Sequence, residues 1–268
     1  MVLSDDRART GLHVTRLGER GPLVAFCHGL FGQGKNWTTV AKALAEDHRV
    51  LLVDMPHHGR SEWVDRFDYI DVADRVATLF DADDPVALVG HSMGGKAAMV
   101  LALRHPELVE RLCVVDVSPV DYHERGEFAG YIDAMLALDL STLAHRRDAD
   151  AALADAVPSR TVRSFLLQNL HHEAGRWSWR PNLEVLGRDL EVLGGWPDDA
   201  LADLPAYDGP TLWIAGQNSG YVRDEYAAAM DRWFPRNRRV VIKAAGHWVH
   251  SEQPEVFLEV LQRFLAGR

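Results

Sequence analysis

The sequence predicts an α/β fold in which a mostly parallel β-sheet carries helices on both faces, and two observations support this prediction. Short apolar runs rich in Val, Leu and Ile have the length of buried strands: 23–27, 49–53, 86–89, 112–117, 211–215 and 240–244. Segments with apolar residues three to four positions apart lie between or after these runs and predict helices: 37–46, 70–80, 96–104, 224–234 and 254–265. Strands that alternate with helices form parallel sheets through crossover connections.

The segment 118–205 interrupts this alternation. It contains helical stretches at 128–138, 149–156 and 161–170 but no clear strand. A connection of this length is too long for an ordinary loop and is expected to form structure of its own. We therefore predict a helical cap at 118–205, inserted into an α/β core that is formed by residues 1–117 and 206–268.

Length and charge limit the range of functions. The chain has 268 residues and a formal net charge of −10, with a pI near 5.7. This average charge argues against nucleic acid or an anionic membrane as the main partner, because both would be repelled. Residues 1–10 lack the apolar core of a signal peptide, and no apolar run is long enough for a membrane span. We expect a soluble, cytoplasmic protein that acts on a small molecule.

The sequence predicts neither a metal site nor a cofactor. Cys27 and Cys113 each lie in an apolar run, which is typical of buried reduced thiols. The segment 54–61 contains an aspartate and two histidines, but no further ligands lie nearby in the sequence, and its Pro, Gly and Ser content favours a tight turn. No phosphate-binding or dinucleotide-binding glycine motif is present.

The most informative motif is Gly90-His-Ser-Met-Gly94, which follows the apolar run 86–89 and precedes the helical segment 96–104. A nucleophilic serine needs this strand–turn–helix setting, because a sharp turn projects its hydroxyl from the edge of the sheet. Glycines flank such a serine because side chains there would strike the neighbouring strand and helix. The sequence predicts Ser92 as a nucleophile, and the alternative is a glycine-rich turn with an unreactive serine.

A serine hydroxyl needs a histidine to accept its proton and a carboxylate to orient that histidine. His247 follows the last predicted strand, in a loop that can bring its imidazole to Ser92, whereas His250 lies closer to the final helix and fits a packing role. Asp116 lies near the carboxyl end of the strand after the Ser92 strand. A charge in an apolar strand costs several kcal/mol unless it is paired, which favours Asp116 as the acid.

Alternatives to the predicted acid remain at this point. The alternative role for Asp116 is structural, to accept backbone N–H groups where the predicted cap begins. Asp121 and Asp224 are reserve candidates for the acid.

Serine attack on a carbonyl creates an oxyanion that needs two N–H donors. The backbone of Met93 is one candidate, because it follows the nucleophile and begins a helix. The other is expected in the segment 27–31, with Leu30 favoured and Phe31 next. For the substrate pocket we predict Phe31 and His91 together with three tryptophans, Trp177, Trp179 and Trp248, although tryptophans in a cap also serve in packing.

These residues together resemble the α/β-hydrolase superfamily, and more narrowly the bacterial YbfF-type esterases with a helical cap. The matching motifs extend over nearly the whole chain: His28-Gly-Leu-Phe-Gly32, Asp54-Met-Pro-His-His-Gly-Arg-Ser61, Gly90-His-Ser-Met-Gly-Gly-Lys96, Asp116-Val-Ser-Pro-Val-Asp-Tyr-His123, Gly216-Gln-Asn-Ser-Gly-Tyr-Val222 and Gly246-His-Trp-Val-His250. In many members of the superfamily the acid follows the strand that here is 211–215. This sequence has Ser219 and no carboxylate in that loop.

The resemblance implies a triad of Ser92, Asp116 and His247 in the superfamily's order of nucleophile, acid and histidine. It also implies hydrolysis of short to medium carboxylic esters, with acyl-CoA thioesters as a further substrate class, through an acyl-enzyme and without a cofactor. A carbon–carbon bond hydrolase, a lyase-type synthase or a perhydrolase could use the same fold. A receptor that binds a ligand without turnover is the alternative from another class. The sequence does not define the oligomeric state.

Overall fold

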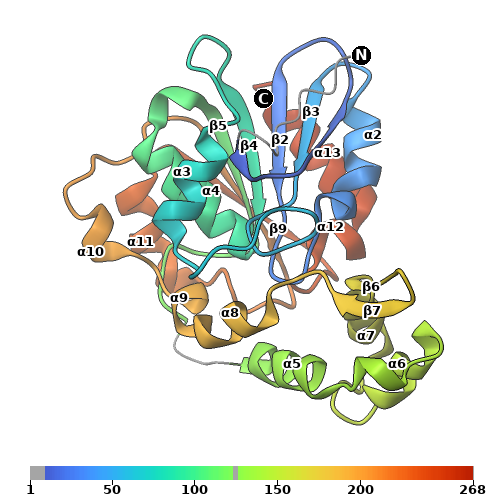
Figure 1. Ribbon diagram of the computed structural model, residues 1–268. Coiled ribbons are helices and arrows are strands. Elements are labelled where there is room, and N and C mark those ends of the chain that lie inside the picture. Colours follow the sequence, from blue (N-terminus) through green and yellow to red (C-terminus); the bar gives the residue numbers. More distant parts are fainter. Residues whose placement is uncertain (1–9, 123–125, 268) are drawn as a thin grey trace.

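A computed structural model describes residues 10–122 and 126–267. Within these residues the main sheet has seven strands in the order β1-β3-β2-β4-β5-β8-β9 (Figure 1). All neighbouring strands are parallel except β1 and β3, which confirms the predicted fold class. The strands are β1 Val14–Leu17, β2 Leu23–Cys27, β3 Arg49–Val53, β4 Val86–His91, β5 Val109–Val115, β8 Thr211–Gly216 and β9 Asn237–Ile242.

Helices cover both faces of this sheet. One face packs against α3 (Tyr69–Ala77), α4 (Met93–Arg104) and α11 (Ala227–Trp233), and the other packs against α2 (Thr38–Leu44), α12 (Val249–Glu252) and α13 (Pro254–Leu265). Alternate residues of one strand belong to different clusters, because successive side chains of a strand point to opposite faces. In β2, for example, Ala25 packs on the α4 side and Phe26 on the α2 side. Three short 3₁₀ helices complete the core: η1 Gly34–Trp37, η2 Pro106–Leu108 and η4 Asp224–Tyr226.

The two cysteines lie within the sheet. Cys27 in β2 and Cys113 in β5 are both free and buried, as predicted. Burial raises the pKa of the Cys27 thiol to about 12, because the thiolate would lose its hydration there. Both side chains therefore contribute to packing as small apolar groups.

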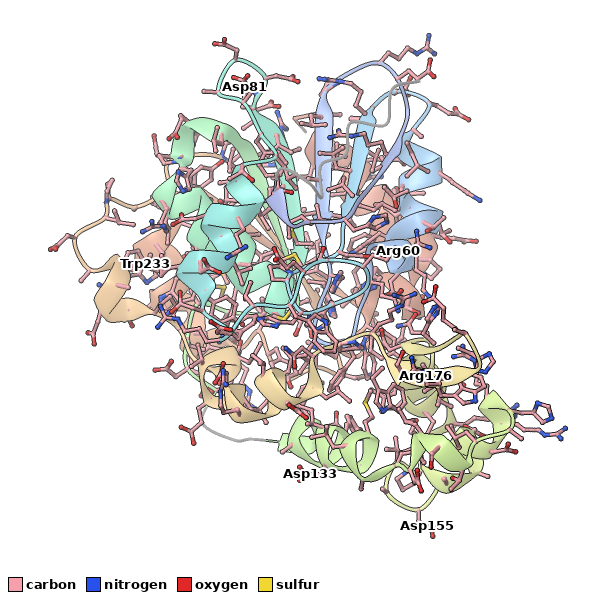
Figure 2. All side chains as sticks on the ribbon, viewed as in Figure 1. Arg60, Asp81, Asp133, Asp155, Arg176 and Trp233 are labelled. Atoms are coloured by element: carbon pink, nitrogen blue, oxygen red, sulfur yellow. The ribbon has the colours of Figure 1, made fainter. Side chains whose placement is uncertain are left out.

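Most of the described part of the inserted segment (residues 118–205) lies over the edge of the sheet at which β2, β4 and β5 end, whereas its last helix lies beside α11 (Figure 1). Its described part contains α5 Gly126–Ala137, η3 Leu140–Thr142, α6 Arg146–Ala152, α7 Arg160–Leu167, α8 Leu183–Arg188, α9 Leu190–Gly194 and α10 Asp198–Leu201. In α5 the buried side chains Tyr131, Ile132 and Met135 face the protein, whereas Asp133 points outward (Figure 2). Burial of this apolar face holds α5 against the rest of the protein.

The inserted segment also contains a feature that the sequence analysis missed. β6 (Leu170–Glu173) and β7 (Arg176–Trp179) form an antiparallel hairpin, so the expectation of no clear strand was wrong. Most of these residues are polar and at least partly exposed, and therefore no apolar run marked them. The tight turn is formed by Ala174 and Gly175, both at positive φ, as a two-residue hairpin connection requires.

Candidate active site

Ser92 occupies the turn between β4 and α4, with φ of 53° and ψ of −121°. This backbone conformation is rare for a residue with a side chain and marks a strained turn of the kind found at functional sites. A Cβ atom at Gly90 would collide with the backbone of Gly94, and one at Gly94 would collide with the carbonyl groups of Cys27 and His28. Both glycines of the motif are therefore required by the close approach of helix and strands.

The structure brings the three predicted triad residues together from distant parts of the chain. Ser92 Oγ lies 3.1 Å from His247 Nε2, and His247 Nδ1 lies 2.7 Å from Asp116 Oδ2. Asp116 immediately follows β5, and His247 lies in the loop between β9 and α12. The Nδ1–H group donates to the carboxylate, which leaves the lone pair of Nε2 free to accept the serine proton.

Asp116 is fully buried and adopts a positive φ of 53°. Its Oδ1 accepts the backbone N–H of Gly216 at 2.9 Å, and its Oδ2 accepts the hydroxyl of Ser219 at 2.5 Å as well as the imidazole of His247. Three donors therefore compensate the carboxylate for lost hydration. Asp116 therefore contacts His247, and the backbone N–H that it accepts belongs to Gly216 at the end of β8 and not to the start of the predicted cap.

Ser219 is a functional candidate to which the sequence analysis gave no role. It lies in the loop after β8, the loop in which many superfamily members carry the acid. Its hydroxyl donates a hydrogen bond to Asp116 from that position. The absence of an acid from residues 216–222 was the signal that could have identified it. Asp121 and Asp224, the reserve acids, do not contact His247.

The backbone amides of Leu30 and Met93 are free to bind an oxyanion. Among the described residues neither amide donates a hydrogen bond, and both residues line the cavity beside Ser92. The amide of Phe31, the second choice in the sequence analysis, instead donates to His58 Nε2 at 3.2 Å. The geometry therefore favours Leu30 over Phe31 as the partner of Met93.

Two buried histidines shape the loop that carries Leu30. His28 Nδ1 donates to the carbonyl of Gly29 and its Nε2 accepts the amide of Met55. His58 Nδ1 donates to the carbonyl of Pro56, so its Nε2 can accept from Phe31. Burial lowers the pKa of His28 to about 4 and that of His58 to about 3, and both rings are neutral near pH 7.

The turn at 54–61 is held by similar bonds. The carboxylate of Asp54 accepts the amides of Gly34 and Arg60, and the hydroxyl of Ser61 donates to the Asp54 carbonyl. The aspartate of this segment therefore bonds to backbone, as a tight turn predicts.

His91 and His250 form a second layer behind His247. His91 Nε2 donates to the carbonyl of His247 at 2.9 Å, and its ring contacts the rings of His247 and His250. The His250 ring stacks on Trp37 with ring centroids 4.1 Å apart. Burial lowers the pKa of His250 to about 3. His250 is thus a packing residue, and His247 alone of the two reaches Ser92.

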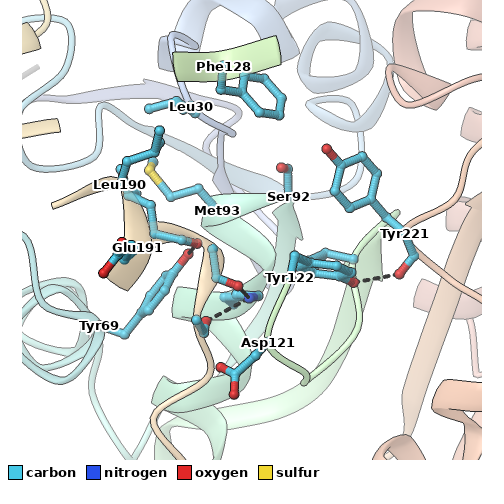
Figure 3. Close-up of a pocket in the computed structure, with 15 residues that line it drawn as sticks. Leu30, Tyr69, Ser92, Met93, Asp121, Tyr122, Phe128, Leu190, Glu191 and Tyr221 are labelled. Carbon is cyan, nitrogen blue, oxygen red and sulfur yellow. Dashed lines mark hydrogen bonds between the residues drawn. The ribbon is translucent and has the colours of Figure 1, made fainter. Parts of the chain in front are cut away.

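A cavity of about 400 Å³ opens beside Ser92, between the core and the inserted segment (Figure 3). Its walls combine apolar side chains with three tyrosines, two carboxylates and one lysine. The lining residues are Leu30, Tyr69, Ser92, Met93, Lys96, Val117, Asp121, Tyr122, Phe128, Leu190, Glu191, Leu193, Gly194, Gly195 and Tyr221.

The predicted pocket residues do not line this cavity, and this part of the site prediction was wrong. The indole N–H groups of Trp177 and Trp179 donate to the carbonyls of Leu143 and Met135, so both tryptophans hold the hairpin to the inserted segment. The remaining three serve elsewhere. Trp248 packs against Phe165, and His91 donates to the carbonyl of His247. Phe31 is buried, with its ring 6.3 Å from that of Phe128 between centroids.

Lys96 is a buried cation in α4 with 1% exposure. Its ammonium group donates to three carbonyl groups, those of Val120 at 2.9 Å and of Gly194 and Gly195 at 2.6 Å each. Burial lowers its pKa to about 7, and the nearby Asp121 carboxylate partly opposes this shift. All three N–H donors of the ammonium are used, so Lys96 links the start of the inserted segment to its end.

Comparisons with known proteins agree with this fold. A family model described as "alpha/beta hydrolase fold" matches residues 22–254. An "sn-1-specific diacylglycerol lipase ABHD11" of Mus musculus is 39% identical over 91% of this chain and 81% of its own length. "Esterase YbfF" of Escherichia coli (strain K12) is 35% identical over 90% of this chain and 92% of its own. A solved structure titled "Marine microorganism esterase" superposes with a TM-score of 0.89 at 28% identity, covering 94% of this chain and 98% of that one.

The chain therefore belongs to the α/β hydrolase fold family, and the resemblance to YbfF-type esterases is confirmed. Within residues 10–122 and 126–267, no helix has both the length and the apolar composition that crossing a bilayer requires.

Proposed function

We propose that this protein is a serine hydrolase that cleaves carboxylic esters through an acyl-enzyme. The observation that carries this proposal is the contact of Ser92 with His247 and of His247 with Asp116, beside two unbonded amides. Two of its relatives, an esterase and a diacylglycerol lipase, support the same class of reaction.

In the proposed reaction Ser92 Oγ attacks the ester carbonyl while His247 Nε2 accepts the hydroxyl proton. The N–H groups of Leu30 and Met93 stabilise the negative oxygen of the tetrahedral intermediate. His247 then protonates the leaving alcohol as the carbon–oxygen bond breaks, which leaves the acyl group on Ser92. A water molecule, deprotonated by His247, then attacks the acyl carbon. The bond from this carbon to Ser92 Oγ breaks, His247 returns the proton to Ser92 Oγ, and the acid is released. Asp116 keeps His247 in the required tautomer and stabilises its cationic form.

The charges around the cavity favour esters of neutral alcohols over acyl-CoA thioesters as substrates. Lys96 is the one cation that lines the cavity among the described residues, and its donors are all bonded to carbonyls. Asp121 adds negative charge to the lining. A polyanionic leaving group would be repelled by this carboxylate.

The proposal extends to the inserted segment. Residues 118–205 act as a cap that closes the substrate pocket over Ser92, because Phe128, Leu190 and Leu193 contribute its apolar wall. The protein works in the cytoplasm, in line with the expectation from its sequence.

Labelling with a fluorophosphonate, followed by mass-spectrometric mapping, tests the nucleophile. The label is expected on Ser92 and is expected to be lost in Ser92→Ala, which should also abolish turnover of p-nitrophenyl butyrate. Ser178→Ala is the matched control, because Ser178 is an exposed serine on the hairpin. Turnover of butyryl-CoA under the same conditions measures the preference for oxygen esters. Label on another residue, or full turnover by Ser92→Ala, would refute the proposal.

A further inference from the structure

The hydroxyl group of Tyr221 lies in the cavity and has no hydrogen-bond partner in the described part of the chain. Figure 3 shows this hydroxyl directed toward the Ser92 side of the cavity. None of the residues that the structure describes donates a hydrogen bond to it or accepts one from it. Burial raises the pKa of Tyr221, and the charges of Glu127 and Asp116 raise it further. The hydroxyl is therefore protonated at neutral pH and is able to donate a hydrogen bond.

The other two tyrosines of the cavity differ from Tyr221 in this respect. The hydroxyl of Tyr69 donates to the carbonyl of Leu193 at 2.8 Å. The hydroxyl of Tyr122 donates to the carbonyl of Tyr221 at 2.6 Å and accepts the amide of Ser118 at 2.7 Å. Both of these side chains hold the walls of the cavity together. Tyr221 alone of the three offers its hydroxyl to a ligand.

The backbone of Tyr221 is fixed, which gives its hydroxyl a defined position. Its carbonyl accepts from Tyr122 and also from the Ser118 hydroxyl at 2.9 Å. Its amide donates to Ser219 Oγ at 3.3 Å, and that same Ser219 hydroxyl donates to Asp116. A donor held in place loses little conformational entropy when it binds a ligand.

The position of the ring relates Tyr221 to the alcohol part of an ester. The ring packs against the imidazole of His247, with centroids 4.3 Å apart and planes at 36°. In the proposed reaction His247 protonates the oxygen of the leaving alcohol, so this alcohol must lie close to His247. A hydroxyl carried on a ring beside His247 is therefore near the alcohol rather than near the oxyanion.

We propose that Tyr221 is a specificity-determining residue, whose hydroxyl binds a second oxygen in the alcohol part of the substrate. The preferred substrates are then esters in which a hydroxyl group lies near the ester oxygen, as in esters of diols and polyols. This inference rests on the proposed ester hydrolysis and adds the substrate class to it.

Two esters of the same acid form a matched pair for the test, 2-hydroxyethyl butyrate and propyl butyrate, because a hydroxyl in one replaces a methyl in the other. The wild-type enzyme is expected to show a higher kcat/KM for the 2-hydroxyethyl ester. Tyr221→Phe is expected to reduce this preference about 3- to 10-fold, the effect of losing one neutral hydrogen bond. The pH profile of kcat/KM should keep its shape, because the hydroxyl does not titrate in the working range.

Tyr207→Phe is the matched control. Its hydroxyl is bonded to the carbonyl of Val109, at the start of β5 and away from the cavity. This variant should retain the wild-type preference between the two esters.

The outcomes separate the inference from the proposed function. If Tyr221→Phe turns over both esters with the wild-type ratio, or loses both in equal proportion, Tyr221 does not select the alcohol and the inference is overturned. If the wild-type enzyme hydrolyses neither these esters nor p-nitrophenyl butyrate, the proposed function itself fails, and the inference fails with it.

Discussion

The hydroxyl of Ser219 donates to the same oxygen of Asp116 that accepts the imidazole of His247. Asp116, the acid of the site, directly follows β5. Ser219, which donates to it, follows the neighbouring strand β8. A serine in the second position leaves a single carboxylate at the site, so no like charge competes for the histidine proton.

Replacing Ser219 should weaken the acid without removing it. We expect Ser219→Ala to lower kcat roughly 10-fold, because a hydrogen bond to a charged group is lost. Ser219→Asp should lower it further, because a second carboxylate beside Asp116 would repel it. Turnover of p-nitrophenyl butyrate measures both effects, with Ser178→Ala as the control. Unchanged kcat in both variants would show that Ser219 has no part in catalysis.

The role of Asp116 can be tested by an isosteric change. Asp116→Asn is expected to lower kcat by about 10⁴, because an amide in this position selects the wrong imidazole tautomer. Labelling of Ser92 by fluorophosphonate should slow in parallel. A folded variant with near-normal turnover would contradict the assignment and would leave Asp116 as a purely structural carboxylate.

The buried histidines predict how stability depends on pH. The pKa of His250 falls to about 3 in the folded protein, compared with about 6.5 for an exposed histidine. Below about pH 6.5 the unfolded state therefore binds a proton that the folded state excludes, so stability is full above this pH and is lost as pH falls. Each such histidine lowers the free energy of unfolding by about 1.4 kcal/mol per pH unit in this range.

A variant isolates the contribution of one ring. His250→Phe keeps an aromatic ring against Trp37 and removes the titrating group. Urea unfolding between pH 7.5 and 4.5 should show a shallower loss of stability, by about 1.4 kcal/mol per pH unit below pH 6. An identical pH dependence in wild type and variant would mean that His250 does not bind this proton on unfolding.

Lys96 should matter for stability more than for substrate binding. Lys96→Met would leave the carbonyls of Val120, Gly194 and Gly195 without their donor. We expect the free energy of unfolding to fall by about 1–3 kcal/mol and cleavage by protease within residues 118–205 to accelerate. Lys42→Met, at an exposed position on α2, is the control. Equal stability and equal protease resistance of both variants would argue against this role.

Local patterns were enough to predict the core and the candidate triad. Buried parallel strands are marked by apolar runs such as 86–89, and Ser92 lies where a strand, a turn and a helix follow one another. Asp116 was detectable because an isolated charge at the end of an apolar strand needs a partner. β1 was missed because only Val14 and Leu17 of its four residues are apolar.

The pocket lining could not be predicted, because it depends on how distant segments pack together. Tyr221, Phe128 and Leu190 meet at the cavity only after the inserted segment has folded over the sheet. The tryptophans suggested a pocket by their size, but the N–H groups of Trp177 and Trp179 are bonded within the inserted segment. Lys96 did carry a detectable signal, since it is a lone charge among the buried residues of α4.

The three bonds of Lys96 also restrict how a substrate can enter. They join Val120, near the start of the inserted segment, and Gly194 and Gly195, in its later part, to α4, the helix that begins directly after Ser92. A movement of Val120, Gly194 and Gly195 away from α4 would have to break all three bonds. Substrate entry that leaves these three bonds intact must therefore leave Val120, Gly194 and Gly195 in place beside the cavity.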